Sequence, residues 1–152
     1  VTGPQDEPLM LLDSVNGDPV PGPPPLGGWL WLELWTADVE QALDFYQALG
    51  GYGAENHSEQ GEEDYWVLVD SSDRWQSGIT KAPFEDVPSQ WVPVIRVADP
   101  VQVVSKVEKL GGRVIVKPDH PLTGGKVALI QDPTGGIFMV ESWEPSDSGQ
   151  EG

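Results

Sequence analysis

The sequence predicts an α+β fold built from two tandem βαβββ units. Three observations lead to this prediction: a strand with two unlike faces, an amphipathic helix between an Asp cap and paired glycines, and the return of this whole pattern later in the chain. The units are expected at residues 28–81 and 91–144, within one domain that covers 28–144. An acidic, Pro-rich arm or linker (1–27) precedes them and a polar tail (145–152) follows.

The first predicted strand alternates strictly from residue 29 to residue 35, so its two faces differ in chemistry. The aliphatic face carries Leu30, Leu32 and Leu34, and the opposite face carries Trp29, Trp31, Glu33 and Trp35. We expect the aliphatic face to receive the helix. The face of indoles and one carboxylate should therefore look into a pocket or towards a partner.

A helix is predicted directly after this strand. Asp38 is a good N-cap, and the following apolar residues recur at helical spacing up to Leu49, where Gly50 and Gly51 end the helix. Turn residues then separate three more predicted strands, at 51–58, 64–70 and 75–81.

The pattern then starts again. Asp99, Leu110 and Gly111–Gly112 follow Asp38, Leu49 and Gly50–Gly51 at one constant offset of 61 residues, which indicates an internal duplication. Residues 91–99 supply the first strand of the second unit and the cap of its helix, and this helix is expected over 100–110. Three strands complete this unit, at 112–117, 126–132 and 136–143.

Charge and composition exclude several classes of partner. The chain has 25 acidic and 8 basic residues, a net charge of −17, so nucleic acid and an anionic membrane surface are not expected partners, whereas a cationic ligand is allowed. Nothing approaches the roughly 18 apolar residues of a membrane span, so no membrane insertion is expected. The compartment stays open: bacterial cytoplasm, or cell envelope if a targeting segment preceding Val1 has been removed.

Of the N-terminal arm, only the apolar run Leu9, Met10, Leu11 and Leu12 could dock on the domain. His57 and His120 are the only imidazoles, and both stand in polar turn surroundings, where ordinary exposed histidines are expected.

Three segments resemble the vicinal oxygen chelate superfamily, which includes glyoxalase I, bleomycin-resistance proteins and extradiol dioxygenases. These segments are residues 31–38 with Phe45–Tyr46, residues 110–114, and residues 127–138. The resemblance implies that the paired units form a curved eight-stranded sheet around a ligand cavity, with the helices outside. It also allows a homodimer.

The resemblance does not extend to the metal ligands. Metal-dependent members place His or Glu on the first and last strands of each unit, but the matching positions here are Trp31, Val92 and Met139. Indole, isopropyl and thioether groups do not ligate a hard divalent cation. We therefore expect no metal at the family position and no cofactor.

The candidate ligand-binding residues are Trp29, Trp31, Glu33, Trp35, Arg96, Met139 and Glu141. Indole faces attract cations, and a carboxylate adds charge and a hydrogen-bond acceptor. The first functional hypothesis is a metal-independent protein that binds a small aromatic or cationic molecule. The alternative is a glyoxalase-type lyase or isomerase with relocated catalytic groups such as Glu33 or Glu141.

A purely structural interpretation competes with both hypotheses. The tryptophans could simply fill the cavity or a dimer interface, with Glu33 paired to Arg96 across the pseudo-twofold axis, because Arg96 occupies the position equivalent to Trp35.

Overall fold

The computed structural model describes residues 1–10, 15, 22–58, 64–84 and 87–145. The chain forms two compact units, one made of Val1–Pro19 and Trp31–Val92 and the other of Val20–Leu30 and Pro93–Gly152. Eight strands and two α-helices lie in the described residues, and each unit has the order strand, helix and three strands. The predicted α+β class and the βαβββ duplication are confirmed.

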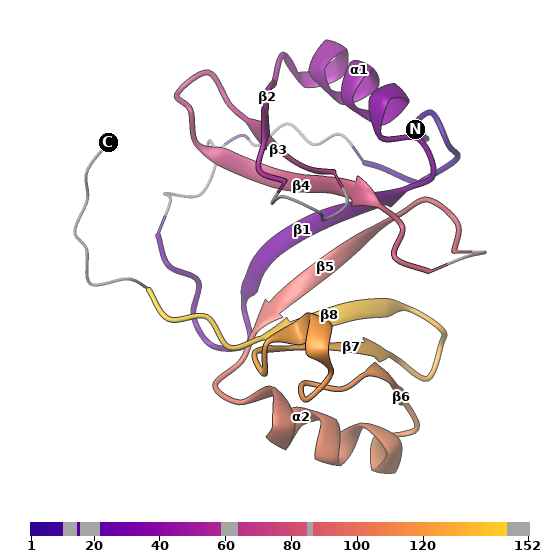
Figure 1. Ribbon diagram of the computed structural model, residues 1–152, viewed down its shortest axis with the longest axis vertical. Helices are drawn as coiled ribbons and strands as arrows, with labels where there is room; N and C mark the ends of the chain where they lie inside the picture. Colours follow the sequence, from indigo (N-terminus) through magenta and orange to yellow (C-terminus); the bar gives the residue numbers. More distant parts are fainter. Residues whose placement is uncertain (11–14, 16–21, 59–63, 85–86, 146–152) are drawn as a thin grey trace. The chain divides into compact units, whose positions relative to one another are not determined.

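The first unit is a four-stranded sheet with one helix on it. In chain order its elements are β1 (Trp29–Thr36), α1 (Val39–Gly50), β2 (Gly53–Asn56), β3 (Tyr65–Val69) and β4 (Trp75–Lys81). The strands lie in the order β2-β3-β4-β1, with β1 parallel to β4 and the other pairs antiparallel. Figure 1 shows α1 lying along one face of this sheet.

The core of the first unit forms where α1 meets the aliphatic face of β1. Leu34 is fully buried against Ala42, Leu43 and Tyr46 of the helix, as the alternation of the strand predicts. Asp38 accepts a hydrogen bond from the backbone N–H of Gln41, which satisfies one of the free donors at the helix N-terminus.

The second unit repeats this arrangement. It contains β5 (Gln90–Arg96), α2 (Pro100–Val107), β6 (Arg113–Val116), β7 (Val127–Gln131) and β8 (Ile137–Glu141), with short 3-10 turns at Glu108–Leu110 and Pro121–Thr123. The strand order is β5-β8-β7-β6, with β5 parallel to β8. Again the helix lies on one face of the sheet (Figure 1), over a core that includes Val107, Ala128 and Ile130.

The structure corrects the predicted helix over residues 100–110. The α-helix ends at Val107, and residues 108–110 continue as a 3-10 turn up to Gly111, whose φ of 85° is left-handed. Gly51 ends α1 in the same way, with a φ of 68°. Glycine adopts this conformation without the steric cost that other residues meet. Gly51 therefore ends α1 as predicted, whereas Gly111 ends the 3-10 turn that follows α2.

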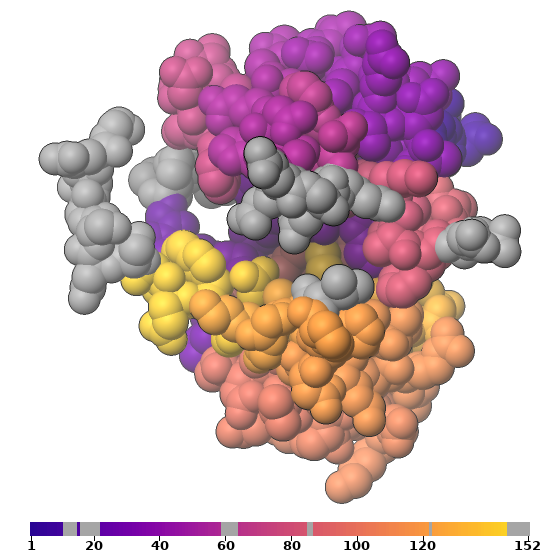
Figure 2. Space-filling view, viewed as in Figure 1, coloured from indigo at the N-terminus to yellow at the C-terminus, as the bar shows by residue number. Residues whose placement is uncertain are grey.

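The N-terminal segment docks differently from the sequence expectation. Residues 1–10 form a small loop closed by a bridge between Thr2 and Pro8, and Figure 2 shows these N-terminal residues beside α1. The residue that anchors the loop is Glu7, which is only 1% exposed, whereas Met10 points outwards. Leu9 packs against the core of the first unit, Met10 is largely exposed, and Leu11 and Leu12 lie outside the described residues.

No helix in the described part of the chain is both long enough and apolar enough to span a bilayer.

Candidate functional site

The seven residues predicted from the sequence divide between the two units. Trp31, Glu33 and Trp35 belong to the first unit, whereas Trp29, Arg96, Met139 and Glu141 belong to the second. Each set is built by its own strands.

In the first unit, the predicted indoles and carboxylate form one hydrogen-bonded network through Tyr65. The indole nitrogen Nε1 of Trp31 donates to the hydroxyl of Tyr65 (3.1 Å), which donates to Oε1 of Glu33 (3.3 Å). The indole nitrogen of Trp35 donates to the other carboxylate oxygen, Oε2 (3.2 Å). Both oxygens of Glu33 therefore accept hydrogen bonds, and these two donors fix the orientation of the carboxylate.

Strand pairing explains how Tyr65 reaches this network. Glu33 lies opposite Gly78 on β4, and β3 lies on the other side of β4. A Cβ atom at Gly78 would collide with the Tyr65 hydroxyl and lie 3.1 Å from the Trp31 indole nitrogen. The missing side chain at Gly78 thus leaves the space in which the tyrosine and the indole meet.

Two further aromatic groups extend the face beyond the network. Trp75 meets Trp31 edge-on, with ring centroids 6.4 Å apart and planes at 62°. His57 packs against Trp75 at 4.9 Å, and its Nε2 lies 3.1 Å from Oε2 of Glu55. The expected exposure of His57 is confirmed, but the sequence did not indicate this contact with an indole.

Trp75 was missed because β4 contains an irregularity. Counting by two from buried Ile79 places Trp75 on the helix side of the sheet. The register between β3 and β4 shifts between Leu68 and Val69, however, so that one extra residue, Gln76, is inserted and Trp75 changes sides. The sequence carries no clear signal for this bulge.

Trp35 differs from the other two indoles in its surroundings. It is buried, and its ring packs edge-on against Phe84, with centroids 6.2 Å apart. Trp35 packs against Phe84 and hydrogen-bonds to Glu33, whereas Trp31 is partly exposed and Trp75 is exposed.

In the second unit, Arg96 holds two chain segments. Its Nε donates to the carbonyl of Trp143 (2.9 Å), its Nη1 donates to the carbonyl of Pro24 (2.6 Å), and the guanidinium carbon lies 5.5 Å from the centre of the Trp143 ring. These contacts use the cation to fasten the segment before β1 and the end of β8. Trp29 follows that segment and is 71% exposed.

Met139 and Glu141 are neighbours of these residues on β8. Met139 pairs with Val94, and Glu141 pairs with Arg96 in register. Burial raises the pKa of the Glu141 carboxyl, and nearby Lys126 partly opposes that rise. A carboxyl group with a raised pKa is a candidate for proton transfer.

The residues at the predicted metal position do not fit a metal ion. Trp31, Val92 and Met139 supply no oxygen or imidazole nitrogen. Among the described residues, no three His, Asp or Glu side chains come together as a potential ligand set. The absence of a bound metal in solution stays a prediction.

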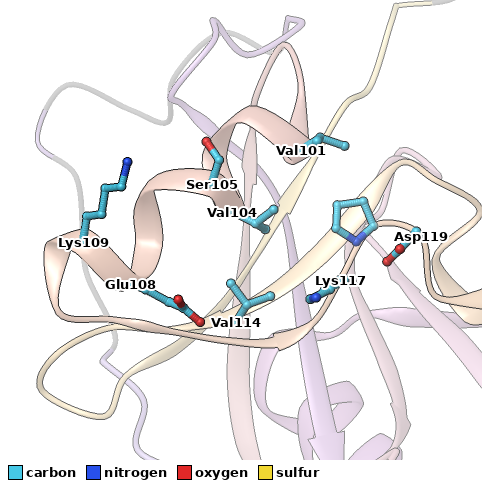
Figure 3. A pocket seen from close by; sticks show the side chains of 9 residues that line it. Val101, Val104, Ser105, Glu108, Lys109, Val114, Lys117 and Asp119 are labelled. Carbon is cyan, nitrogen blue, oxygen red and sulfur yellow. The ribbon is translucent and has the colours of Figure 1, made fainter.

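A separate groove of about 510 Å³ lies on the second unit, between one face of α2 and residues 114–119 (Figure 3). Val104 and Val114 lie at its centre, and charged groups of both signs surround them. These charged groups are Glu108, Lys109, Lys117 and Asp119. None of the predicted site residues lines this groove.

Comparison with known proteins identifies relatives of this architecture. The model of the Glyoxalase/Bleomycin resistance protein/Dioxygenase superfamily matches residues 28–140. CFP32 of Mycobacterium tuberculosis, which carries the name of a glyoxylase, is 32% identical over 114 residues, covering 75% of this chain and 43% of the relative. The anthracycline biosynthesis protein DnrV of Streptomyces peucetius is 28% identical over 128 residues, covering 75% of this chain and 46% of that protein. The chain thus spans less than half the length of these relatives.

Solved structures share the fold at low sequence identity. The methylmalonyl-CoA epimerase of Streptomyces coelicolor matches with a TM-score of 0.55 at 14% identity, over 82% of this chain and all of the epimerase chain. The epimerase of Mycobacterium tuberculosis matches with a TM-score of 0.54 at 14% identity, over 83% of this chain and 94% of the other. At this identity the similarity shows the fold alone.

Proposed function

The chain belongs to the Glyoxalase/Bleomycin resistance protein/Dioxygenase superfamily, and from this premise we propose that it binds a small aromatic or cationic molecule. The proposed contact surface in the first unit is the indole–carboxylate face, which we define as Trp31, Glu33, Tyr65 and Trp75. Trp35 is not part of this face, but its indole nitrogen donates a hydrogen bond to Glu33 and helps to orient the carboxylate. Trp29, Arg96, Met139 and Glu141 are the candidate ligand-binding residues of the second unit, taken by itself.

The observation that carries this proposal is the pair of hydrogen bonds that hold the Glu33 carboxylate. An indole and a phenol hold its two oxygens, and neither donor brings a positive charge. These two donors add no positive charge of their own, and they hold the carboxylate in place, so that it need not reorganise when a cation arrives. The donors therefore act as a preformed support for an electrostatic contact.

The aromatic rings supply the second part of the recognition. Trp31 and Trp75 stand at 62° to each other, so they form a corner rather than a flat stack. A cation over an indole face gains about 0.5–2 kcal/mol, depending on how far it is desolvated. The net charge of −17 further favours the approach of cations over anions.

A pair of nearly isosteric probes tests the proposal. N-methylquinolinium and neutral 1-methylnaphthalene have the same ring size and differ mainly in charge. We expect the cation to bind more tightly, with a change in tryptophan fluorescence. Glu33→Gln should weaken cation binding by about 1–3 kcal/mol, the scale of a charge-assisted hydrogen bond, and leave the neutral probe little affected.

Glu40→Gln is the matched control, because it removes the same charge from an exposed position of α1 in the same unit. Equal losses in the two variants would reduce the effect to net charge. If Glu33→Gln lowered the melting temperature and left cation binding unchanged, Glu33 would be a structural residue, and the proposal would fail.

A second candidate function is proton transfer of the lyase or isomerase type. The raised pKa of Glu141 favours it, because a carboxyl group that titrates nearer to neutral pH is a better general base or acid. Exchange of carbon-bound protons of a screened substrate with D2O, present in the wild type and lost in Glu141→Gln, would support this function. Exchange that persists in this variant would exclude Glu141.

A further inference from the structure

The first unit contains an apolar groove on its helix side, away from the indole–carboxylate face. Its volume is about 540 Å³. The groove lies between the C-terminal half of α1, the aliphatic side of the sheet and the N-terminal segment. Its lining residues in the described part of the chain are Pro8, Leu9, Met10, Leu32, Tyr46, Leu49, Gly50, Tyr52, Leu68, Gln76, Ser77 and Trp91.

None of these described lining residues carries a charge, although more than one residue in five of the whole chain does. The groove on α2 has a similar size but four charged side chains around it. A volume of about 300–1,000 Å³ suits a small organic ligand. Burying a charged ligand against an uncharged wall would leave its charge unpaired, which is costly. The groove therefore fits a neutral, largely apolar molecule.

Ser77 and Tyr52 bring hydroxyl groups to the groove, and Ser77 is 7% exposed. The polar atoms of Tyr46, Gln76 and Trp91 in the same lining make hydrogen bonds within the chain. A hydroxyl in a largely apolar pocket fixes the orientation of a ligand that carries a matching donor or acceptor. The bulge at Gln76 sets this part of β4, since Ser77 pairs with Leu68 just before the register shifts.

The N-terminal segment forms one wall of the groove, and a buried carboxylate fastens it. The hydroxyl of Tyr46 donates to Oε1 of Glu7 (2.8 Å), and the backbone N–H of Gln5 donates to Oε2 (3.0 Å). The indole of Trp91 in turn donates to the Tyr46 hydroxyl (3.2 Å). A Cβ atom at Gly3 would collide with the Glu7 carboxylate, so the loop closes tightly around it.

The same side chains that hold the wall also line the groove. Tyr46 and Trp91 contact the cavity and form the hydrogen-bonded chain to Glu7. Pro8, Leu9 and Met10 follow Glu7 directly and supply the wall itself. Releasing Glu7 would therefore remove three lining residues from the groove at once.

We propose that this groove is a second binding site, for a neutral and largely apolar molecule with one hydrogen-bonding group, and that residues 1–10 form its wall. The site is independent of the indole–carboxylate face, because the two lie on opposite faces of the sheet and use different side chains of β1.

Two dyes with the same ring skeleton test the charge preference. N-phenyl-1-naphthylamine is neutral, and 1-anilinonaphthalene-8-sulfonate adds one sulfonate. We expect the neutral dye to bind the full chain at one saturable site and the anionic dye to bind at least tenfold more weakly. Equal affinities, or no saturable binding of the neutral dye, would overturn the proposal.

The duplication supplies a matched pair of variants. Leu49 and Leu110 are equivalent in the two units and both are exposed, but only Leu49 lines the groove. Leu49→Lys should weaken binding of the neutral dye at least tenfold, and Leu110→Lys should leave it unchanged. Equal effects in the two variants would refute the site. If Leu49→Lys instead changed the sedimentation of the protein from dimer to monomer, the groove would be a contact between two copies.

Glu7→Ala tests the wall. We expect a several-fold loss of affinity for the neutral dye, together with faster hydrogen exchange of the amides in residues 1–10. An unchanged circular dichroism spectrum would show that the rest of the unit is intact. The less disruptive Glu7→Gln keeps the side-chain size and should show a smaller loss in the same direction. Full affinity in both variants would overturn the role of the N-terminal wall.

Discussion

The two units place different side chains on one backbone plan. At equivalent positions, Trp31 and Glu33 on the first strand of one βαβββ repeat correspond to Val92 and Val94 on the first strand of the other, and both valines are buried. Tyr46 on α1 corresponds to Val107 on α2, and both of these are buried too. The second unit therefore shows what the fold needs, namely aliphatic packing. The polar groups of the first unit are additions that the fold does not require.

The helices of the two units occupy equivalent positions but make different contacts. Tyr46 and Val107 both pack the helix onto its sheet, but only the tyrosine has a hydroxyl, which binds Glu7 of the N-terminal segment. The first unit thus depends on a contact between residues far apart in sequence. The second unit has no equivalent contact at Val107.

The largest expected effect comes from making the first unit like the second at this position. Tyr46→Val removes a buried ring and leaves the Glu7 carboxylate without its phenol donor, so the free energy of unfolding should fall by about 3–5 kcal/mol. Urea denaturation measures this. Val107→Ala is the control and should cost less, because it removes two methyl groups and no hydrogen bond. Equal losses would show that the hydroxyl adds nothing.

The second prediction concerns alkaline pH. Burial, together with the hydrogen bond to Glu7, raises the pKa of Tyr46 above its ordinary value. The folded state therefore holds this proton more tightly than the unfolded state, so the stabilisation is complete below about pH 10 and is lost as the pH rises further. Stability should fall by up to about 1.4 kcal/mol per pH unit above pH 10 from this group.

Tyr46→Phe isolates this effect, since the other titrating groups are unchanged. Its stability should decline less steeply between pH 10 and pH 11.5 than that of the wild type. Parallel curves for the two proteins would show that Tyr46 titrates normally.

The smallest effect is expected from the helix caps, a feature that the two units share. Asp38 caps α1 through the N–H of Gln41, and Asp99 caps α2 through the N–H of Val101. Asp38→Ala and Asp99→Ala should each lower the free energy of unfolding by about 1 kcal/mol. A loss in only one variant would mean that the two caps, which accept from the N–H three and two residues further on, differ in energy.

Much of the fold follows from local signals. The alternation of β1, the two Asp caps and the left-handed Gly51 and Gly111 are short-range features, and they place most elements within one or two residues. The early end of α2 was missed because residues 108–110 keep a helical sequence pattern while their backbone tightens into a 3-10 turn. Such a change depends on packing rather than on the local sequence.

The candidate site was predicted only in part, because its other members arrive through strand pairing. Trp31 and Glu33 are visible on one strand, but Tyr65 reaches them from β3 across the space left by Gly78. Trp75 joins them only because a bulge reverses its side. Nothing in the sequence indicates that Glu7 is buried, because an acidic residue in a Pro-rich acidic segment is expected to be solvated. Its partner Tyr46 lies 39 residues further along the chain.

The position of Glu7 bears on where this protein can be cut. Hydropathy and the family match both suggest a fragment that starts at Gly28. Such a fragment would discard the carboxylate that the Tyr46 hydroxyl binds and would uncover the side of α1 beneath residues 1–10. A protein fragment that keeps the first unit intact therefore has to include residues 1–10, which precede the region matched by the family model. Affinity tags are better placed at the other end of the chain.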